Sequence, residues 1–410
     1  MPEHKIKSIK AREILDSRGY PTVEVELATG SGVFLASTPS GTSKGKYEAH
    51  ELRDGGDRYF GFGVTKAVEN IEKTIAPELL GKDVRDQEFI DQTLIELDGT
   101  IHKARLGANA ILPVSVAVLK AGAHSERIPL WQWIAKLAGT TPNLPFPCIL
   151  FMEGGLHGRG DLDTQEFMVV IQDHDFSDRL RFGTEMYHTF KEILIKKFGK
   201  AATNVGLEGG FTPPIHDTVE ALDLLMKAIK KSKQKKARII LDMAATTFFK
   251  DDKYYFEGEI MDRSNLLNFY SDIVKKYPIE GIEDPFSEED WLGFQEITEK
   301  LGRKIHIIGD DLLVTNKERI IRAHKEEAGN SLILKPNQVG TFTETLEALK
   351  AAKSVCCWEV FVKHRSGETS DTFLADLAVG LGTGWIMAGA PQRGERVAKY
   401  NRLLRISQEF

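Results

Sequence analysis

A lysine at the end of a short apolar run is the first residue of this sequence that could do chemistry. The run from 331 to 334 leads directly into Lys335, and Pro336 and Asn337 then break the pattern. A short apolar run bounded by turn residues predicts a buried strand. Burial disfavours the charged form of an amine, so we expect the pKa of Lys335 to be lowered towards values that suit a base. The alternative is a lysine that points into water, as most lysines do.

Acidic residues end the neighbouring apolar runs in the same way. If the runs are strands of one barrel, their ends meet at one mouth, where clustered carboxylates would repel one another and raise one another's pKa. A hard divalent cation would relieve that repulsion, and all-oxygen ligation favours magnesium over zinc. The acidic residues at the ends of these runs are Asp242, Glu283, Asp284, Asp310 and Asp311, and earlier runs add Glu166 and Glu208.

One reaction class suits a lysine base that faces a carboxyl group across a magnesium ion. It is the removal of a proton next to a carboxylate, in which the metal stabilises the doubly charged enolate. A further run ends in His364, Arg365 and Ser366. The planar donors of Arg365, with the hydroxyl of Ser366, would suit a phosphate group.

The elements that must position these residues follow from the same pattern. From Cys148 onward, apolar runs alternate with helical segments, which predicts parallel strands with crossover helices. The run ends lie roughly 25–40 residues apart, close to one βα unit each, so we expect a closed β/α barrel. The first third instead has strand patterns followed by helical patterns, which predicts a small α+β domain. We expect an α+β domain over 1–135, with a mobile Gly/Ser loop near residue 43, and a barrel over 140–410.

Composition restricts the class of protein. The formal charge of -6 over 410 residues does not favour nucleic-acid binding. The three cysteines, Cys148, Cys356 and Cys357, have spacing that fits neither a zinc site nor a disulfide framework, and this favours a reducing compartment. Neither an apolar leader nor an apolar run of about 18 residues is present in the sequence. We therefore expect a cytoplasmic protein without a membrane or nucleic-acid partner.

The sequence resembles the enolase family, the phosphopyruvate hydratases of glycolysis, over nearly its whole length. The segments that carry the resemblance, in enolase order, are AREILDSRGYPTVEVEL, LGANAIL, QEFM, EGGF, IEDPF, GDDLLVTN, LKPNQVGT, HRSGETSDT, GLGTG and ERVAKYNRLLRI. The resemblance implies an α/β fold with an enolase-type (β/α)8 barrel after an α+β capping domain. It also implies a homodimer or a higher homo-oligomer.

The resemblance further implies a role for each matching residue in converting 2-phosphoglycerate to phosphoenolpyruvate. Lys335 would take the C2 proton, and Glu208, with Glu166 beside it, would help the C3 hydroxyl to leave. One magnesium ion would be bound tightly and a second would bind with the substrate. The first ion would be held by Asp242, Glu283 and Asp310, the second by Ser43, the phosphate by Arg365 and Ser366, and the rest of the site would be lined by His157 and His364.

The largest departure from the family pattern is Met387. Enolases have a lysine there that pairs with the substrate carboxylate, and losing one such partner can cost roughly 10²–10³ in rate. Methionine is also apolar and flexible, so it would reshape the floor of the pocket. The other departures lie near the same mouth: Lys44, Glu153, Leu156, Leu207, Thr246 and Thr247.

These departures leave three hypotheses open. The first is ordinary enolase activity on 2-phosphoglycerate. The second is the same magnesium-assisted elimination on a related phosphorylated or phosphono carboxylic acid, as in the enolase-like synthase of carboxyphosphonoenolpyruvate. The third is a non-catalytic, enolase-like binding or structural protein, which the presence of Lys335, Glu208 and the predicted metal ligands disfavours.

Overall fold

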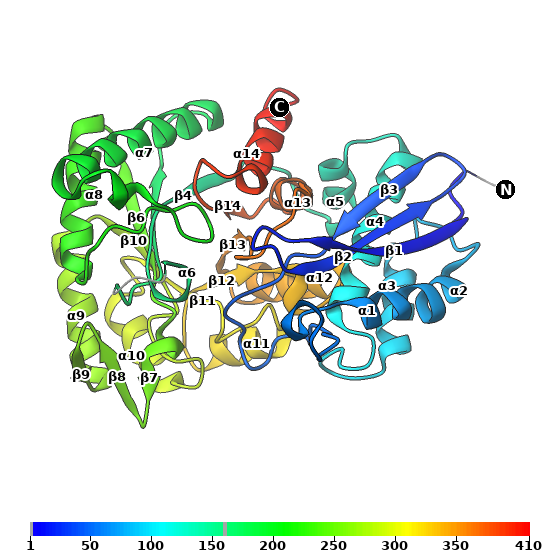
Figure 1. The fold of residues 1–410 in the computed structure, drawn as a ribbon, viewed down its shortest axis with the longest axis horizontal. Helices are drawn as coiled ribbons and strands as arrows, with labels where there is room; N and C mark the ends of the chain where they lie inside the picture. Colours follow the sequence, from blue (N-terminus) through cyan, green and yellow to red (C-terminus); the bar gives the residue numbers. More distant parts are fainter. Residues whose placement is uncertain (1–2, 159–161) are drawn as a thin grey trace.

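The computed structural model describes residues 3–158 and 162–410. A three-stranded antiparallel sheet with its helices precedes a closed eight-stranded barrel, and the two parts lie side by side (Figure 1). The elements of the first part are β1 (Ser8–Leu15), β2 (Pro21–Ala28), β3 (Val33–Ser37), α1 (Thr65–Asn70), α2 (Ala76–Leu79), α3 (Gln87–Asp98), α4 (Ala108–Glu126) and α5 (Leu130–Ala138).

The small sheet packs on the long helix α4. Along β2, alternation places Val23, Val25 and Leu27 on one face, and all three are fully buried. Helix α4 contacts β2 and β3 and is buried along most of its length. The order predicted for the first third, strands followed by helices, is therefore present.

Eight strands close the barrel in the order β10-β11-β12-β13-β14-β4-β5-β6. The barrel strands are β4 (Phe146–Glu153), β5 (Glu166–Ile171), β6 (Ala237–Asp242), β10 (Ile279–Glu283), β11 (His306–Gly309), β12 (Ser331–Leu334), β13 (Glu359–Lys363) and β14 (Gly384–Met387). The predicted barrel is confirmed, but the expectation that its strands are all parallel is wrong. Strand β5 runs antiparallel to both β4 and β6.

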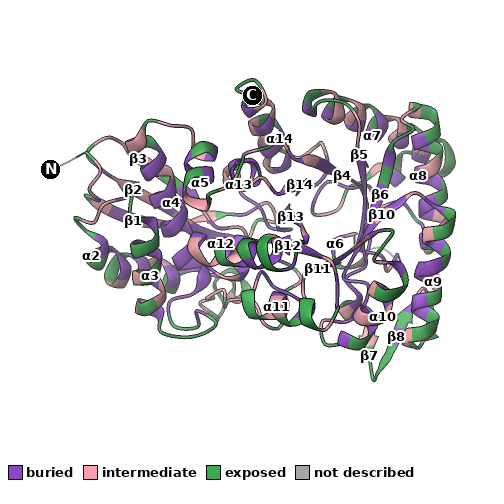
Figure 2. Ribbon diagram, turned by 180° about the vertical axis from the view of Figure 1, so that it is seen from behind, coloured by how far each residue is buried: buried purple, intermediate pink, exposed green. Residues whose placement is uncertain are grey.

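Helices surround the barrel with one buried face and one exposed face, as Figure 2 shows. The outer helices are α7 (Phe176–Phe198), α8 (Thr218–Ser232), α9 (Arg263–Lys276), α10 (Trp291–Leu301), α11 (Lys317–Lys325), α12 (Phe342–Lys350), α13 (Phe373–Leu381) and α14 (Gly394–Ile406). Smaller elements are α6 (Gly155–Gly158), β7 (Phe249–Lys250), β8 (Lys253–Phe256) and β9 (Glu259–Met261). None of the described helices is both long and apolar enough to cross a membrane.

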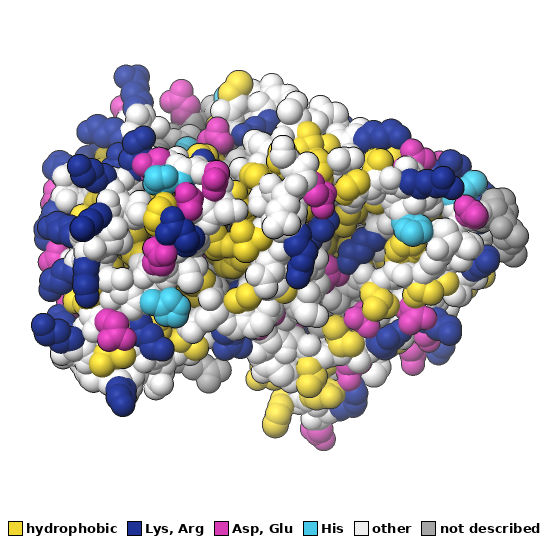
Figure 3. Space-filling model, turned by 90° about the horizontal axis from the view of Figure 1, so that it is seen from above, with side chains coloured by type: hydrophobic (Ala, Val, Ile, Leu, Met, Phe, Trp, Pro, Cys, Tyr) yellow, Lys and Arg dark blue, Asp and Glu magenta, His cyan; other side chains and the backbone are white. Residues whose placement is uncertain are grey.

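Charges of both signs are mixed on the outer surface. Figure 3 shows lysine and arginine side chains interspersed with acidic ones on the face seen from above. On α7, Arg181 pairs with Asp178 and Glu185, while Lys197 pairs with Glu220 on α8. Such exposed pairs contribute little to stability.

Candidate active site

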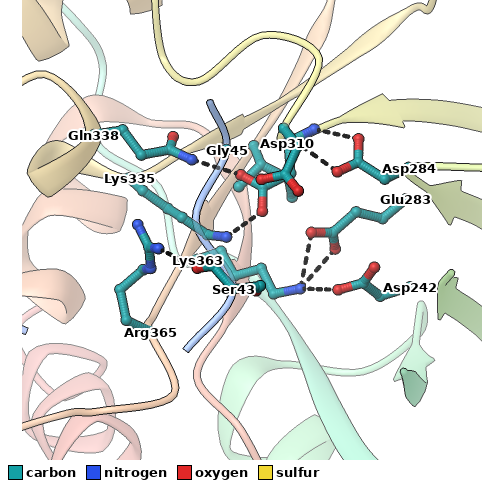
Figure 4. A network of polar contacts seen from close by, with 12 residues as sticks. Ser43, Gly45, Asp242, Glu283, Asp284, Asp310, Lys335, Gln338, Lys363 and Arg365 are labelled. Atoms are coloured by element: carbon teal, nitrogen blue, oxygen red, sulfur yellow. Dashed lines mark hydrogen bonds and ion pairs between the residues drawn. The ribbon is translucent and has the colours of Figure 1, made fainter. Parts of the chain in front are cut away.

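The ammonium group of Lys363 lies at the centre of an acidic cluster at the mouth of the barrel (Figure 4). Its Nζ atom lies 2.8 Å from Asp242 Oδ2, 2.9 and 2.8 Å from the two carboxylate oxygens of Glu283, and 3.2 Å from Glu166 Oε1. All four side chains are buried. Burial acts to lower the pKa of Lys363, but the carboxylates of Asp242, Glu166 and Glu283 hold it well above its usual value.

Strand register brings these four residues together. Glu283 and Asp242 are register partners at the ends of β10 and β6, and Glu166 lies opposite Asp242 across the β5–β6 pair. Because β5 is antiparallel to β6, its first residue lies at the mouth where the parallel strands end. Lys363 is the last residue of β13. The reversed strand therefore adds a carboxylate that an all-parallel barrel would place at the opposite end.

A second ion pair joins Lys335, just after β12, to Asp310, just after β11. Gln338 Nε2 donates a second hydrogen bond to Asp310 Oδ1, at 2.9 Å. Lys335 is 6% exposed, so it does not point into water. The expected lowering of its pKa is wrong, however. Burial acts to lower the pKa of Lys335, but the charge of Asp310 outweighs this effect and the pKa is raised.

Glu208 lies on another side of the mouth, between two histidines. His364 Nε2 lies 2.7 Å from Glu208 Oε2, and His157 Nδ1 lies 3.5 Å from Glu208 Oε1. Arg396 Nη1 donates to His364 Nδ1 at 2.5 Å, and because arginine only donates, the proton of a neutral His364 lies on Nε2 and faces Glu208. Burial acts to raise the pKa of Glu208, but His364 and His157 hold it well below its usual value.

Arg365 anchors the loop between β3 and α1 to the barrel. Its Nη1 donates to Glu48 Oε2 at 2.8 Å, and its Nη2 donates to the backbone oxygen of Ser43 at 2.9 Å. A Cβ atom on Gly41 would lie 1.9 Å from Arg365 Nη2, so only glycine allows this close approach. The predicted Gly/Ser loop is therefore folded over the mouth in this structure.

The same loop also contacts Ser366. The backbone N–H of Thr42 donates to Ser366 Oγ at 2.8 Å. Both residues predicted to bind phosphate, Arg365 and Ser366, are thus bonded to the loop here. They are buried side by side, so an anion that enters between them would find donors from both.

These residues line a small cavity. Its described lining consists of Gly41, Ser43, His157, Gln165, Glu166, Glu208, Asp242, Asp310, Lys335, Lys363, His364, Arg365 and Ser366. All of the predicted site residues except Glu283 and Met387 lie in this lining. Glu283 contacts the cavity through Lys363, whereas Met387 is buried in the core of the barrel, at 1% exposure.

The acidic residues of the mouth could hold a divalent cation. Asp242 and Glu283 already surround one positive charge, the ammonium of Lys363, with carboxylate oxygens, which are the ligands that magnesium prefers. Asp310 pairs with Lys335 instead, so the three predicted metal ligands are bonded to two different ammonium groups here. Two other groups of the described residues have ligand atoms within 4.8 Å of one another: His157, Glu166 and Glu208, and Asp284, Asp310 and Asp311.

The departures from the family pattern have identifiable contacts. Glu153 Oε1 accepts a hydrogen bond from the backbone N–H of Glu208 at 2.6 Å. Thr246 Oγ1 accepts one from the backbone N–H of Glu288, and Lys44 pairs with Glu51 in the loop. Each of these side chains therefore supports the loop or the backbone around the mouth. The other departures are Leu156, which is half-exposed, Leu207 and Thr247.

Comparison with known proteins agrees with this architecture. The family model described as the enolase C-terminal TIM barrel domain matches residues 141–410, and that of the enolase N-terminal domain matches residues 6–134. An enolase from Pyrococcus furiosus is 49% identical over 413 residues, which cover 99% of this chain and 95% of that protein. Enolase B from Dictyostelium discoideum is 50% identical over 421 residues, with the same coverage. The chain belongs to the enolase family. The resemblance inferred from the motifs is therefore confirmed.

Lys363 is the residue of this enolase-family site that sequence reasoning missed. It directly precedes the predicted His364, in the segment VFVKHRS. The signal in the sequence was strand alternation, since Lys363 follows Phe361 by two residues and therefore points to the same side of β13. In the structure, the ring of Phe361 stacks on the ring of Trp385 on β14, at 5.0 Å. A lysine at the last such position of a buried strand needs acidic partners, and seven acidic residues had already been predicted in the other apolar runs.

Proposed function

We propose that this chain is an enolase that dehydrates 2-phosphoglycerate to phosphoenolpyruvate. The observation that carries the proposal is one cavity lined by a buried lysine, Lys335, and a buried carboxylate, Glu208, with Arg365 and Ser366 beside them. Sequence identity of about half over nearly the full length of curated enolases supports it. The reaction class is that of a lyase.

In this proposal, the chain's own residues bind the substrate and move its protons. Arg365 and Ser366 exchange their bonds with the loop for bonds to the phosphate. Lys335 takes the proton from C2, and Glu208 assists the departure of the C3 hydroxyl, with Glu166 beside it. His157 and His364 orient Glu208, since both lie within 3.5 Å of its carboxylate. The loop over the mouth excludes water while the proton is transferred.

Magnesium is the cofactor that we propose. Asp242, Glu283 and Asp310 would hold the first ion, with Asp310 turning from Lys335, and Ser43 would help to hold a second one together with the phosphate. A divalent cation there supplies the positive charge that stabilises the enolate. The fit rests on the all-oxygen donor set around Lys363.

The remaining features of the proposal concern organisation. We propose that residues 1–135 form the capping domain with its mobile loop, and that residues 140–410 form the barrel that carries the metal and catalytic site. We also propose a cytoplasmic homodimer. Sedimentation equilibrium of the purified chain would test the dimer directly.

Phosphoenolpyruvate formation from 2-phosphoglycerate with magnesium tests the proposed function. The wild type, Met387→Lys and Lys335→Ala should be compared. We expect turnover by the wild type and none by Lys335→Ala. Turnover only after Met387→Lys would instead favour a related phosphorylated or phosphono acid as the natural substrate. Magnesium binding without turnover of any such acid would favour a non-catalytic protein.

A further inference from the structure

Lys363 and Met387 are register partners on neighbouring strands of the barrel. Lys363 ends β13, Met387 ends β14, and the two residues are directly paired. The methionine is the position where the family pattern has a lysine, and the lysine one strand away lines the cavity. The mouth of the barrel thus keeps a lysine at this level, displaced sideways by one strand.

The ammonium of Lys363 occupies oxygens that a metal ion would need. It lies within 2.9 Å of Asp242 Oδ2 and of both oxygens of Glu283. Magnesium binds such oxygens at about 2.0–2.1 Å, so one ligand set cannot serve both cations at once. A cation that binds Asp242 and Glu283 must therefore displace the ammonium, and the flexible four-carbon side chain of lysine allows it to move.

Once displaced, the ammonium of Lys363 can move only towards the polar cavity. The neighbouring side chain at its own level is the apolar Met387, whereas the cavity is lined by the cationic donors Lys335 and Arg365. These two already have acidic partners, in Asp310 and Glu48. The displaced ammonium would enter the cavity after giving up two of its three carboxylate partners, with Glu166, 3.2 Å from it here, as the carboxylate that remains beside it.

We propose that Lys363 binds the carboxylate of the substrate, the task that Met387 cannot perform. In the free protein its ammonium neutralises Asp242 and Glu283; it yields their oxygens to a divalent cation and then pairs with the substrate carboxylate. The last step, pairing with the substrate carboxylate, rests on the proposed function. The competition between the ammonium of Lys363 and a divalent cation for the oxygens of Asp242 and Glu283 can be measured without turnover.

An exchange of the two side chains tests the proposal. The variants are Lys363→Met and the double variant Lys363→Met/Met387→Lys, which has the composition and net charge of the wild type. Calorimetric titration with magnesium should give about 10- to 100-fold tighter binding for Lys363→Met, the range by which groups bonded to metal ligands alter affinity. With 2-phosphoglycerate, Lys363→Met should lose roughly 10²–10³ in kcat/KM, and the double variant should recover to within about tenfold of the wild type.

Lys103→Met is the matched control. Lys103 is equally buried, at 3% exposure, and pairs with Glu344 at 2.6 Å, away from the acidic cluster. Its variant should leave magnesium affinity unchanged, and circular dichroism would check that each variant is folded.

Three results would overturn the proposal. They are unchanged or weaker magnesium binding by a folded Lys363→Met, a folded double variant as impaired as Lys363→Met, and full wild-type turnover without any divalent cation. If the wild type does not turn over 2-phosphoglycerate, the proposed function fails separately. Calorimetric binding of 2-phosphoglycerate in the presence of magnesium then replaces kcat/KM in the comparison.

Discussion

Glu48 should control how tightly the loop between β3 and α1 closes over the mouth. Its carboxylate and the guanidinium of Arg365 form a buried pair, with Nη1–Oε2 at 2.8 Å and Nη2–Oε1 at 3.2 Å. Glu48→Gln keeps the shape but removes the charge, and places an amide nitrogen against one of the two guanidinium donors. Removing one partner of such a buried, hydrogen-bonded pair costs about 2–5 kcal/mol.

This loss would destabilise the closed conformation of the loop. If all of it weakens closure, the fraction of open loop rises about 30- to 4,000-fold. Lys44 and Lys46 lie in the loop and are trypsin sites. When opening is fast relative to cleavage, the cleavage rate follows the open fraction. We therefore expect Glu48→Gln to be cut at these lysines at least 30-fold faster than the wild type.

Asp376→Asn separates local opening from a general loss of stability. Asp376 is also buried and also forms a two-point pair, with Arg402, at 2.8 and 2.5 Å, but away from the loop. This variant should lower the temperature of unfolding without faster cleavage at the loop. Equal cleavage of the wild type and Glu48→Gln, or faster loop cleavage in Asp376→Asn, would refute the reasoning.

Two further predictions follow from shifted pKa values. Burial and the charges of Glu208 and Glu166 raise the pKa of Glu153 well above its usual value. Glu153→Gln, which mimics the protonated acid, should therefore change kcat/KM and the temperature of unfolding little, and a loss beyond tenfold in kcat/KM would contradict this. Burial raises the pKa of Asp91, which accepts hydrogen bonds from Thr343, to about 6. A carboxyl group with a raised folded-state pKa favours folding at low pH, so the free energy of unfolding should fall by up to about 3 kcal/mol as the pH rises from about 4 to about 6. Urea titrations of the wild type and Asp91→Asn should show that the variant lacks this fall.

Short-range pattern predicted which residues end the strands, and through them most of the site. The apolar runs before Asp242, Glu283 and Asp310 are strands, and their regular spacing identified the barrel. The direction of β5 was not predictable in this way. An apolar run such as EFMVVI has the same letters whether the strand runs up or down the barrel, and only closure of the sheet decides its direction.

Electrostatic properties were less predictable, because they are sums over tertiary contacts. Burial of Lys335 followed from its position, but the pKa depends on how close Asp310 lies. For Lys363, the inward direction followed from alternation, whereas its role depends on three carboxylates from three other strands. The bonds of Arg365 to the loop likewise join segments more than 300 residues apart.

The central claim is that Lys335 removes the carbon-bound proton of the substrate. Loss of deuterium from C2-deuterated 2-phosphoglycerate in water, with magnesium present, tests it most directly, because proton exchange does not require loss of the hydroxyl. The wild type and Glu208→Gln should both release deuterium, while only the wild type forms phosphoenolpyruvate at an appreciable rate. Lys335→Ala should release none. Deuterium release by a folded Lys335→Ala at a rate near that of the wild type would contradict the claim.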